Sequence, residues 1–156
     1  MLLAAASLAG CEYADGEPRP AGSSAALPSA PPASTTSAEE AAPQAEVIAK
    51  VESLMGEPGG VVSLGATGGM RTGHGFDTSG LLPDTGTYAV RAVCAGGPGA
   101  ILTVRQHGAE ILSQQIECGT PYDAMVDLAS GQVSAALEPI GEAGQVGAAV
   151  RFAGPV

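Results

Sequence analysis

Residues 122–138 have the sequence YDAMVDLASGQVSAALE, and this stretch carries the strongest fold signal in the chain. In its first half, apolar residues alternate with Asp123 and Asp127. After the turn signal Ser130-Gly131, apolar residues alternate again with polar ones. Strict alternation is typical of antiparallel strands with one buried face. The stretch therefore predicts two antiparallel strands joined by a short turn.

The same alternation recurs on both sides of this stretch. The apolar positions of the further runs are Tyr88, Val90, Ala92 and Cys94, then Leu112, Ile116 and Cys118, and finally Val146, Ala148, Val150 and Phe152. Val61, Val62 and Leu64 indicate one more strand, and residues 70–78 indicate another. Short runs separated by glycine-rich turn signals predict an all-β domain over residues 58–156. We expect an antiparallel β-sandwich of the jelly-roll or Ig-like kind.

Residues 44–57 have a different period. Apolar residues fall at helical spacing from Val47 to Met55, and Gly56 with Pro58 provides a stop signal. The segment predicts one short N-terminal amphipathic helix that packs on the β domain. A helix that binds a partner is the alternative interpretation.

The N-terminus carries the clearest targeting signal. Residues 1–10 are apolar or small, and their last three residues form the motif Leu8-Ala9-Gly10-Cys11 with the cysteine that follows. This run is too short to span a bilayer but matches the apolar region of a signal peptide. No Lys or Arg precedes it, so we expect either that the true start lies upstream or that the segment has been trimmed. A plain signal peptide that happens to contain a cysteine is the alternative.

Residues 11–43 are rich in Ala, Pro, Ser and acidic residues, and their large aliphatic side chains are limited to Leu27. Such a segment cannot bury enough apolar surface to offset the entropy of ordering it. Its prolines favour extended conformers. We therefore expect a disordered, semi-stiff spacer.

The motif Leu8-Ala9-Gly10-Cys11 resembles the lipobox of bacterial lipoproteins. That resemblance implies cleavage between Gly10 and Cys11 and attachment of a diacylglycerol to Cys11. The protein would then be held on the extracytoplasmic face of the cell membrane by this lipid.

The two remaining cysteines, Cys94 and Cys118, form an even pair, and both fall on the inward-facing set of their strands. Disulfides persist in exported proteins, so we expect these two residues to be joined. A loop of this size predicts a stabilisation of roughly 3–4 kcal/mol in the chain-entropy model. A metal or redox pair is the competing interpretation, although the chain has no Cys-x-x-Cys spacing.

The chain as a whole resembles small lipid-anchored β-sandwich proteins of GC-rich Gram-positive bacteria. The resemblance rests on the lipobox, the spacer, the Ala/Gly-rich composition and the pattern Tyr88, Val90, Cys94, Cys118 and Gly119. It implies a fold and a cellular location but no particular activity.

Composition excludes several classes of function. The chain has 16 acidic and 6 basic residues, a formal net charge of −10 and no tryptophan. Nucleic-acid binding requires clustered Lys and Arg, which are absent here. Aromatic residues that could stack on sugar rings are few, which weakens a lectin role.

Groups that could support catalysis are scarce. His74, with Asp77 nearby, could serve as a base or a metal ligand, whereas His107 lies in an expected hairpin turn. No second histidine lies at metal-ligand spacing, and no nucleophile elbow is present. The glycines of residues 65–69 lack the Gly-Lys-Ser/Thr ending of a phosphate loop. We therefore expect no cofactor, no metal and no enzymatic activity.

The sequence favours a lipid-anchored binding or accessory module whose partner is an envelope protein or a glycan. Two alternatives stay open. One is a small hydrolase or metal-dependent enzyme centred on His74 and Asp77, which requires a cleft that contains both side chains. The other is a structural protein of the cell envelope.

Overall fold

The computed structural model describes residues 38–156, and their side chains from residue 44 onward. The signal segment, Cys11 and most of the predicted spacer lie outside the described residues. The described part consists of one helix followed by eight strands. These are α1 (Ala38–Met55), β1 (Val62–Met70), β2 (Phe76–Leu82), β3 (Gly86–Ala95), β4 (Gly99–Gln106), β5 (Ala109–Glu117), β6 (Tyr122–Leu128), β7 (Gly131–Pro139) and β8 (Val146–Ala153).

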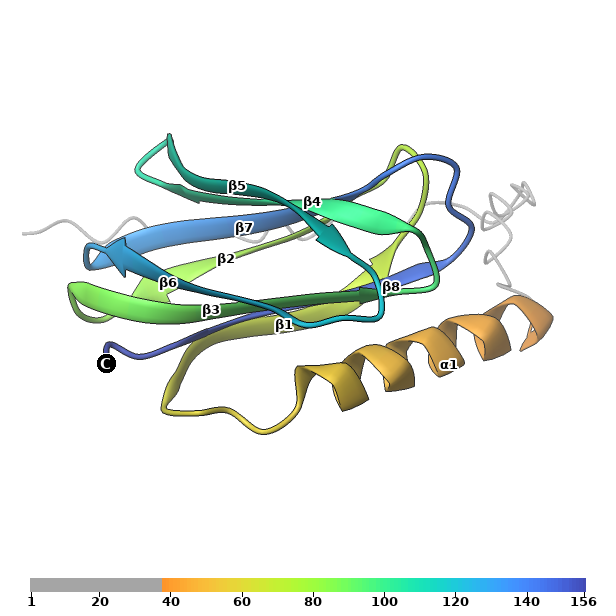
Figure 1. Cartoon of the computed structure of the whole chain (residues 1–156), viewed down its shortest axis with the longest axis horizontal. Helices are drawn as coiled ribbons and strands as arrows, with labels where there is room; N and C mark the ends of the chain where they lie inside the picture. The colour runs from red at the N-terminus through yellow and green to blue at the C-terminus, as the bar shows by residue number, and fades with distance from the viewer. Residues whose placement is uncertain (1–37) are drawn as a thin grey trace, which may run out of the picture. The chain divides into compact units, whose positions relative to one another are not determined.

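The strands form two four-stranded antiparallel sheets that face each other (Figure 1). One sheet has the order β1-β8-β3-β6 and the other has the order β2-β7-β4-β5. This is the strand order of a jelly roll, in which the chain passes repeatedly from one sheet to the other. The predicted all-β antiparallel sandwich is confirmed, and the topology decides for the jelly-roll alternative over the Ig-like one.

The core lies between the two sheets and is formed by the side chains that alternation placed inward. Its largest fully buried members are Tyr88, Phe152, Leu102 and Leu137. The hydroxyl of buried Tyr88 donates a hydrogen bond of 2.7 Å to the carbonyl of Asp84, so its polar end is satisfied. The alternating pattern of residues 122–138 corresponds to β6 and β7, and Val126, Val133 and Leu137 all point into this core.

Helix α1 covers the outer face of the β1-β8-β3-β6 sheet (Figure 1). Val51 on the helix is fully buried against Val93, Ala95 and Ala149 of the sheet. Consequently β8 is buried on both of its faces along most of its length, although its sequence had predicted one buried face. The reason is that its outward positions lie beneath the helix, where small residues allow a close approach.

Gly147 of β8 shows how close that approach is. A Cβ atom at this position would lie 2.8 Å from Cγ2 of Val51 and 3.0 Å from the carbonyl oxygen of Val47. Real Cβ atoms do not approach other atoms this closely, so the absence of a side chain is what permits the helix to dock here.

Helix α1 begins at Ala38, earlier than residue 44, where the sequence analysis placed its start. Residues 38–42 are alanine and glutamate, which favour helix intrinsically but carry no apolar periodicity. Periodicity alone could not detect this first part. Similarly, β1 ends at Met70 and β2 begins at Phe76, so the expected strand over residues 70–78 is replaced by a hairpin turn and the ends of two strands.

Two arginines of the sheet hold the C-terminal end of α1. Arg151 donates hydrogen bonds to the carbonyls of Met55, Gly56 and Glu57, at 2.9 to 3.2 Å. Arg91 donates a further bond of 3.2 Å to the carbonyl of Met55. The last carbonyls of a helix have no partner within the helix and carry partial negative charge. The arginines satisfy these carbonyls and fix the position of the helix end.

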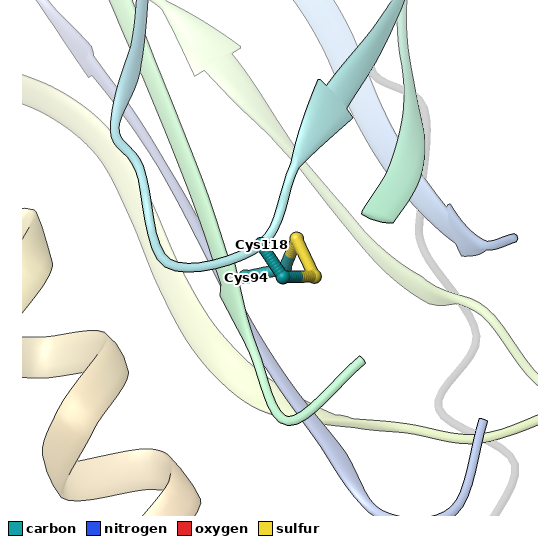
Figure 2. The surroundings of a disulfide bond; sticks show 2 residues. All are labelled: Cys94 and Cys118. Atoms are coloured by element: carbon teal, nitrogen blue, oxygen red, sulfur yellow. A yellow bond between two sulfur atoms is a disulfide. The ribbon is translucent and has the colours of Figure 1, made fainter. Parts of the chain in front are cut away.

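The predicted disulfide between Cys94 and Cys118 is present (Figure 2). Cys94 is fully buried near the end of β3, and Cys118 follows β5 directly, so the bond ties the two sheets together at one end of the sandwich. Their Cα atoms are 4.5 Å apart. The amide of Gly119 donates a hydrogen bond of 2.7 Å to the carbonyl of Cys94 and closes the same junction.

Candidate ligand-binding face

The outer face of the β2-β7-β4-β5 sheet is a polar surface on the side of the sandwich away from α1. No described element packs over it, and its outward positions are mainly small polar or charged residues. They are Asp77, Ser79 and Leu81 on β2, Gln132, Ser134, Ala136 and Glu138 on β7, Ile101, Thr103 and Arg105 on β4, and Ser113 and Gln115 on β5. We call this surface the open face.

Strand register arranges these side chains in rows across the sheet. Ser79 lies beside Ser134, which lies beside Arg105. In the adjacent row, Asp77, Ala136 and Thr103 occupy neighbouring strands in the same way. Residues directly opposite each other on one face have Cβ atoms about 5 Å apart, so their functional groups can act on a single ligand.

The centre of the open face is hollowed. The hollow has a volume of about 370 Å³, and its lining includes every member of the two rows together with Gln132 and Glu138. Small side chains such as Ser134 and Ala136 form its floor, while Arg105 and Glu138 are long and exposed. The hollow thus offers hydroxyl, carboxylate, amide and guanidinium groups within one shallow depression.

Charges on the open face are only loosely paired. Arg105 lies 3.9 Å from Glu110, and both side chains are more than half exposed. An exposed pair at this distance contributes little to stability, so Arg105 keeps its capacity to bind an acceptor on a ligand.

We call the outer face of the β1-β8-β3-β6 sheet, on which α1 packs, the covered face. Two of its charged side chains form a close pair. Arg91 donates two hydrogen bonds to the carboxylate of Asp123, from Nε to Oδ1 at 2.7 Å and from Nη2 to Oδ2 at 2.9 Å. This hydrogen bonding lowers the pKa of Asp123 below its ordinary value and raises the pKa of Arg91, against a smaller opposing effect of desolvation. Both groups serve the docking of α1, because Arg91 also binds the helix end.

The structure does not bring His74 and Asp77 into one cleft. His74 lines a cleft beside α1, whereas Asp77 lines the hollow of the open face. Within residues 44–156, no group of three or more His, Cys, Asp or Glu side chains is close enough to hold a metal ion. The enzyme alternative therefore lacks the juxtaposition that it required.

The other residues singled out from the sequence have distinct positions. His107 occupies the tight turn between β4 and β5, with a φ of +51°, and Gly108 beside it has a φ of +81°. Two consecutive positive φ values are the requirement of the hairpin turn that matches strand twist. Cys11 and Gly10, with the proposed lipid attachment and cleavage, lie outside the described residues. Helix α1 does not have the length and apolarity needed to cross a bilayer.

Aromatic side chains take no part in the open face. Tyr88 and Phe152 are fully buried, and Phe76 and Tyr122 pack partly buried against the same core. Any recognition by this face therefore depends on hydrogen bonds and charge, since ring stacking has no exposed partner among the described residues.

Sequence reasoning did not identify the open face as a site. Asp77 was considered only as a partner of His74, and the outward residues of β7 only as the polar half of an alternating pattern. The available signal was composition: along β2, β4 and β7 the outward positions include repeated Ser, Thr and Ala where solvated faces commonly carry long charged side chains. Which of the two sheets is covered by the helix could not be read from that signal.

No protein-family model matches the chain, and no curated protein matches its sequence. Several solved structures are similar to it. A carbohydrate-binding module from Cellvibrio mixtus lichenase 5A, in complex with cellotriose, is 16% identical with a TM-score of 0.40, over 62% of this chain and 91% of that chain. The carbohydrate-binding module CBM36, in complex with calcium and xylotriose, is 16% identical with a TM-score of 0.35, over 60% of this chain and 91% of that chain. A de novo designed double-stranded β-helix is 13% identical with a TM-score of 0.36, over 57% of this chain and 97% of that chain.

Proposed function

We propose that this chain is a lipid-anchored, extracytoplasmic binding module without catalytic activity, and that its ligand docks on the open face. The observation that carries the proposal is the asymmetry of the sandwich. On one outer face, α1 packs over an apolar patch formed by Val93, Ala95 and Ala149, while the other face is polar, hollowed and uncovered by any described element.

The chemistry of the hollow favours a polyhydroxylated ligand, such as an envelope glycan. Hydroxyls of a sugar both donate and accept hydrogen bonds, and the rows through Ser79 and Asp77 supply both kinds of partner. Without stacking on aromatic rings, each site would bind weakly. Many copies anchored on one membrane through Cys11 would compensate by multivalent attachment to a polymer.

Retention on purified cell-wall polysaccharide and on insoluble peptidoglycan tests this function. The protein used is the full chain carrying Cys11→Ser, which removes the proposed lipid attachment. We expect retention on one of the two fractions, and we expect Ser134→Leu to reduce it at least about fivefold because the larger side chain fills the hollow.

Ser53→Leu is the matched control, since Ser53 is exposed on α1, which covers the other sheet. Equal retention of the two variants would show that the open face is not the site. Release of soluble fragments from either fraction would establish an enzyme instead. A chain that binds neither fraction, but whose deletion weakens the envelope, would favour the structural alternative.

The anchor has its own test. Intact mass of the mature protein should show a diacylglyceryl adduct on Cys11, and Cys11→Ser should abolish the adduct and release the protein from the membrane fraction. A membrane fraction that retains the Cys11→Ser variant would contradict lipid anchoring.

A further inference from the structure

A second cleft lies between the middle of α1, the hairpin that joins β1 to β2 and the start of β8. It has a volume of about 310 Å³, within the range of small-molecule sites. The residues that line it are Gln44, Val47, Ile48, Gly69, Met70, Arg71, His74, Gln145, Val146 and Gly147. Although the chain carries 16 acidic residues, none of these lining residues is acidic.

The backbone of the two basic residues of the cleft is held by the hairpin turn. Arg71 and His74 face each other across the hairpin turn and exchange backbone hydrogen bonds of 2.9 and 2.8 Å. The turn between them is anchored, because the Thr72 hydroxyl bonds both the carbonyl and the amide of Ala143, at 2.8 and 2.9 Å. Side chains opposite each other on a two-stranded ladder point to the same side. Arg71 and His74 are therefore held together on one wall of the cleft.

Neither basic side chain makes a hydrogen bond or ion pair with any residue that the structure describes. This differs from Arg91 and Arg151, whose guanidinium groups are occupied by Asp123 and by the end of α1. Arg71 thus presents an unused planar donor, which suits a carboxylate through two parallel hydrogen bonds.

The rest of the cleft combines an apolar part with the polar side chains of Gln44 and Gln145. Val47 and Ile48 of the helix are half-buried there, and Met70 and Val146 of the sheet are buried. A Cβ atom at Gly69 would lie 2.8 Å from Nε2 of Gln44, so a larger residue there would displace the Gln44 side chain. A ligand that fits both parts needs one anionic group and a short apolar chain.

We propose that this cleft is a binding site for a short-chain organic carboxylate, with the carboxylate on Arg71 and His74 and the aliphatic chain against Val47 and Ile48. The site is separate from the open face and does not depend on the proposed function.

Calorimetric titration of the full chain carrying Cys11→Ser tests the proposal, with sodium hexanoate as the probe. Hexanoate should bind saturably at one site. Acetate and inorganic phosphate lack the apolar chain, and 1-hexanol lacks the charge, so each should bind at least about tenfold more weakly. Equal binding of hexanol and hexanoate would overturn the role of the basic pair, and absence of saturable hexanoate binding would overturn the site.

Two variants locate the binding. Arg71→Gln should weaken hexanoate about tenfold, because it removes a charge-assisted hydrogen bond from an exposed position that the fold does not need. Gly69→Val should also weaken it, since the new side chain displaces Gln44 and narrows the cleft. Arg105→Gln, on the open face, is the control and should leave hexanoate binding unchanged.

Unchanged affinity in both Arg71→Gln and Gly69→Val would place the carboxylate elsewhere and refute the proposal. Retention of Arg71→Gln on wall polysaccharide should equal that of the unaltered chain. The proposal for the cleft and the proposal for the open face can therefore be refuted independently of each other.

Discussion

The two outer faces of the sandwich are built from antiparallel strands of similar length, yet one is covered and the other is open. Outward positions of β3 and β8 include Val93, Ala95 and Ala149, all buried under α1. Outward positions of β2, β4 and β7 carry Ser, Thr, Asp and Arg instead. The difference teaches that the covered face contributes to stability, while the open face is available for recognition.

The largest expected effect comes from placing the same charge on each face. Val51→Asp puts a carboxylate into a fully buried apolar contact and should lower the free energy of unfolding by about 3–5 kcal/mol, or undock α1. Ser134→Asp adds the same group to the open face beside Arg105 and should change stability by less than about 0.5 kcal/mol. Urea denaturation of the full chain measures both, and equal losses would remove the distinction between the faces.

Breaking the link between the sheets should affect both faces together. The double variant Cys94→Ala/Cys118→Ala removes a crosslink over a sequence separation of 24 residues and should cost about 3–4 kcal/mol. Thermal denaturation with and without reductant checks this value. If the unaltered protein loses no stability on reduction, the disulfide does not stabilise the junction between the two sheets.

Glycine substitutions distinguish positions on the covered face itself. Gly147→Ala should cost about 1–3 kcal/mol, because the added Cβ collides with Val51 and with the helix backbone at Val47. Gly65→Ala, on the same face, is the control, since its nearest new neighbour would be 3.6 Å away. Its effect on stability should be neutral or slightly positive.

Substituting one arginine on each face tests whether their charged side chains contribute differently to stability. Arg151→Ala removes three hydrogen bonds to the end of α1 and should cost about 1 kcal/mol after allowance for partial exposure. Amide hydrogen exchange should report faster fraying of the last turn of the helix. Arg105→Ala, whose ion pair is long and exposed, should change neither stability nor exchange measurably.

The smallest effect concerns pH. Because hydrogen bonding lowers the pKa of Asp123 in the folded state, its contribution is fully present above the ordinary Asp pKa of about 3.9 and is lost as pH falls through the lower folded-state value. Asp123 is 58% exposed, so this contribution stays below about 1 kcal/mol. Asp123→Asn should flatten the acid limb of a stability–pH curve, and an unchanged limb would contradict this linkage.

Much of the sandwich could be predicted from local patterns. The inward residues of β6 and β7 match the alternation of residues 122–138 position by position. The disulfide followed from the same parity, which placed Cys94 and Cys118 inward. The double burial of β8 was missed, because a strand under a helix and a strand with one solvated face can both contain the same small apolar residues.

The candidate sites were less predictable than the fold. Proximity along the chain suggested a pair of His74 and Asp77, but β2 carries Asp77 onto the open face while His74 stays at the hairpin beside α1. No local pattern singles out Arg71 as a site residue. Only the hairpin turn and the docked helix place it with His74 beside the apolar side chains of Val47 and Ile48.

The sequence by itself determined the antiparallel sandwich class, the helix that precedes it, the inward sets of strands such as β3, β6 and β7, and the pairing of the cysteines, because these depend on period and parity along the chain. The tertiary structure alone decided the order of the strands, which face the helix covers, and which polar residues share a hollow. These features depend on contacts between segments far apart in sequence, such as Val51 with Ala149 and Ser79 with Ser134. Local patterns constrain each of these segments but do not choose its partner.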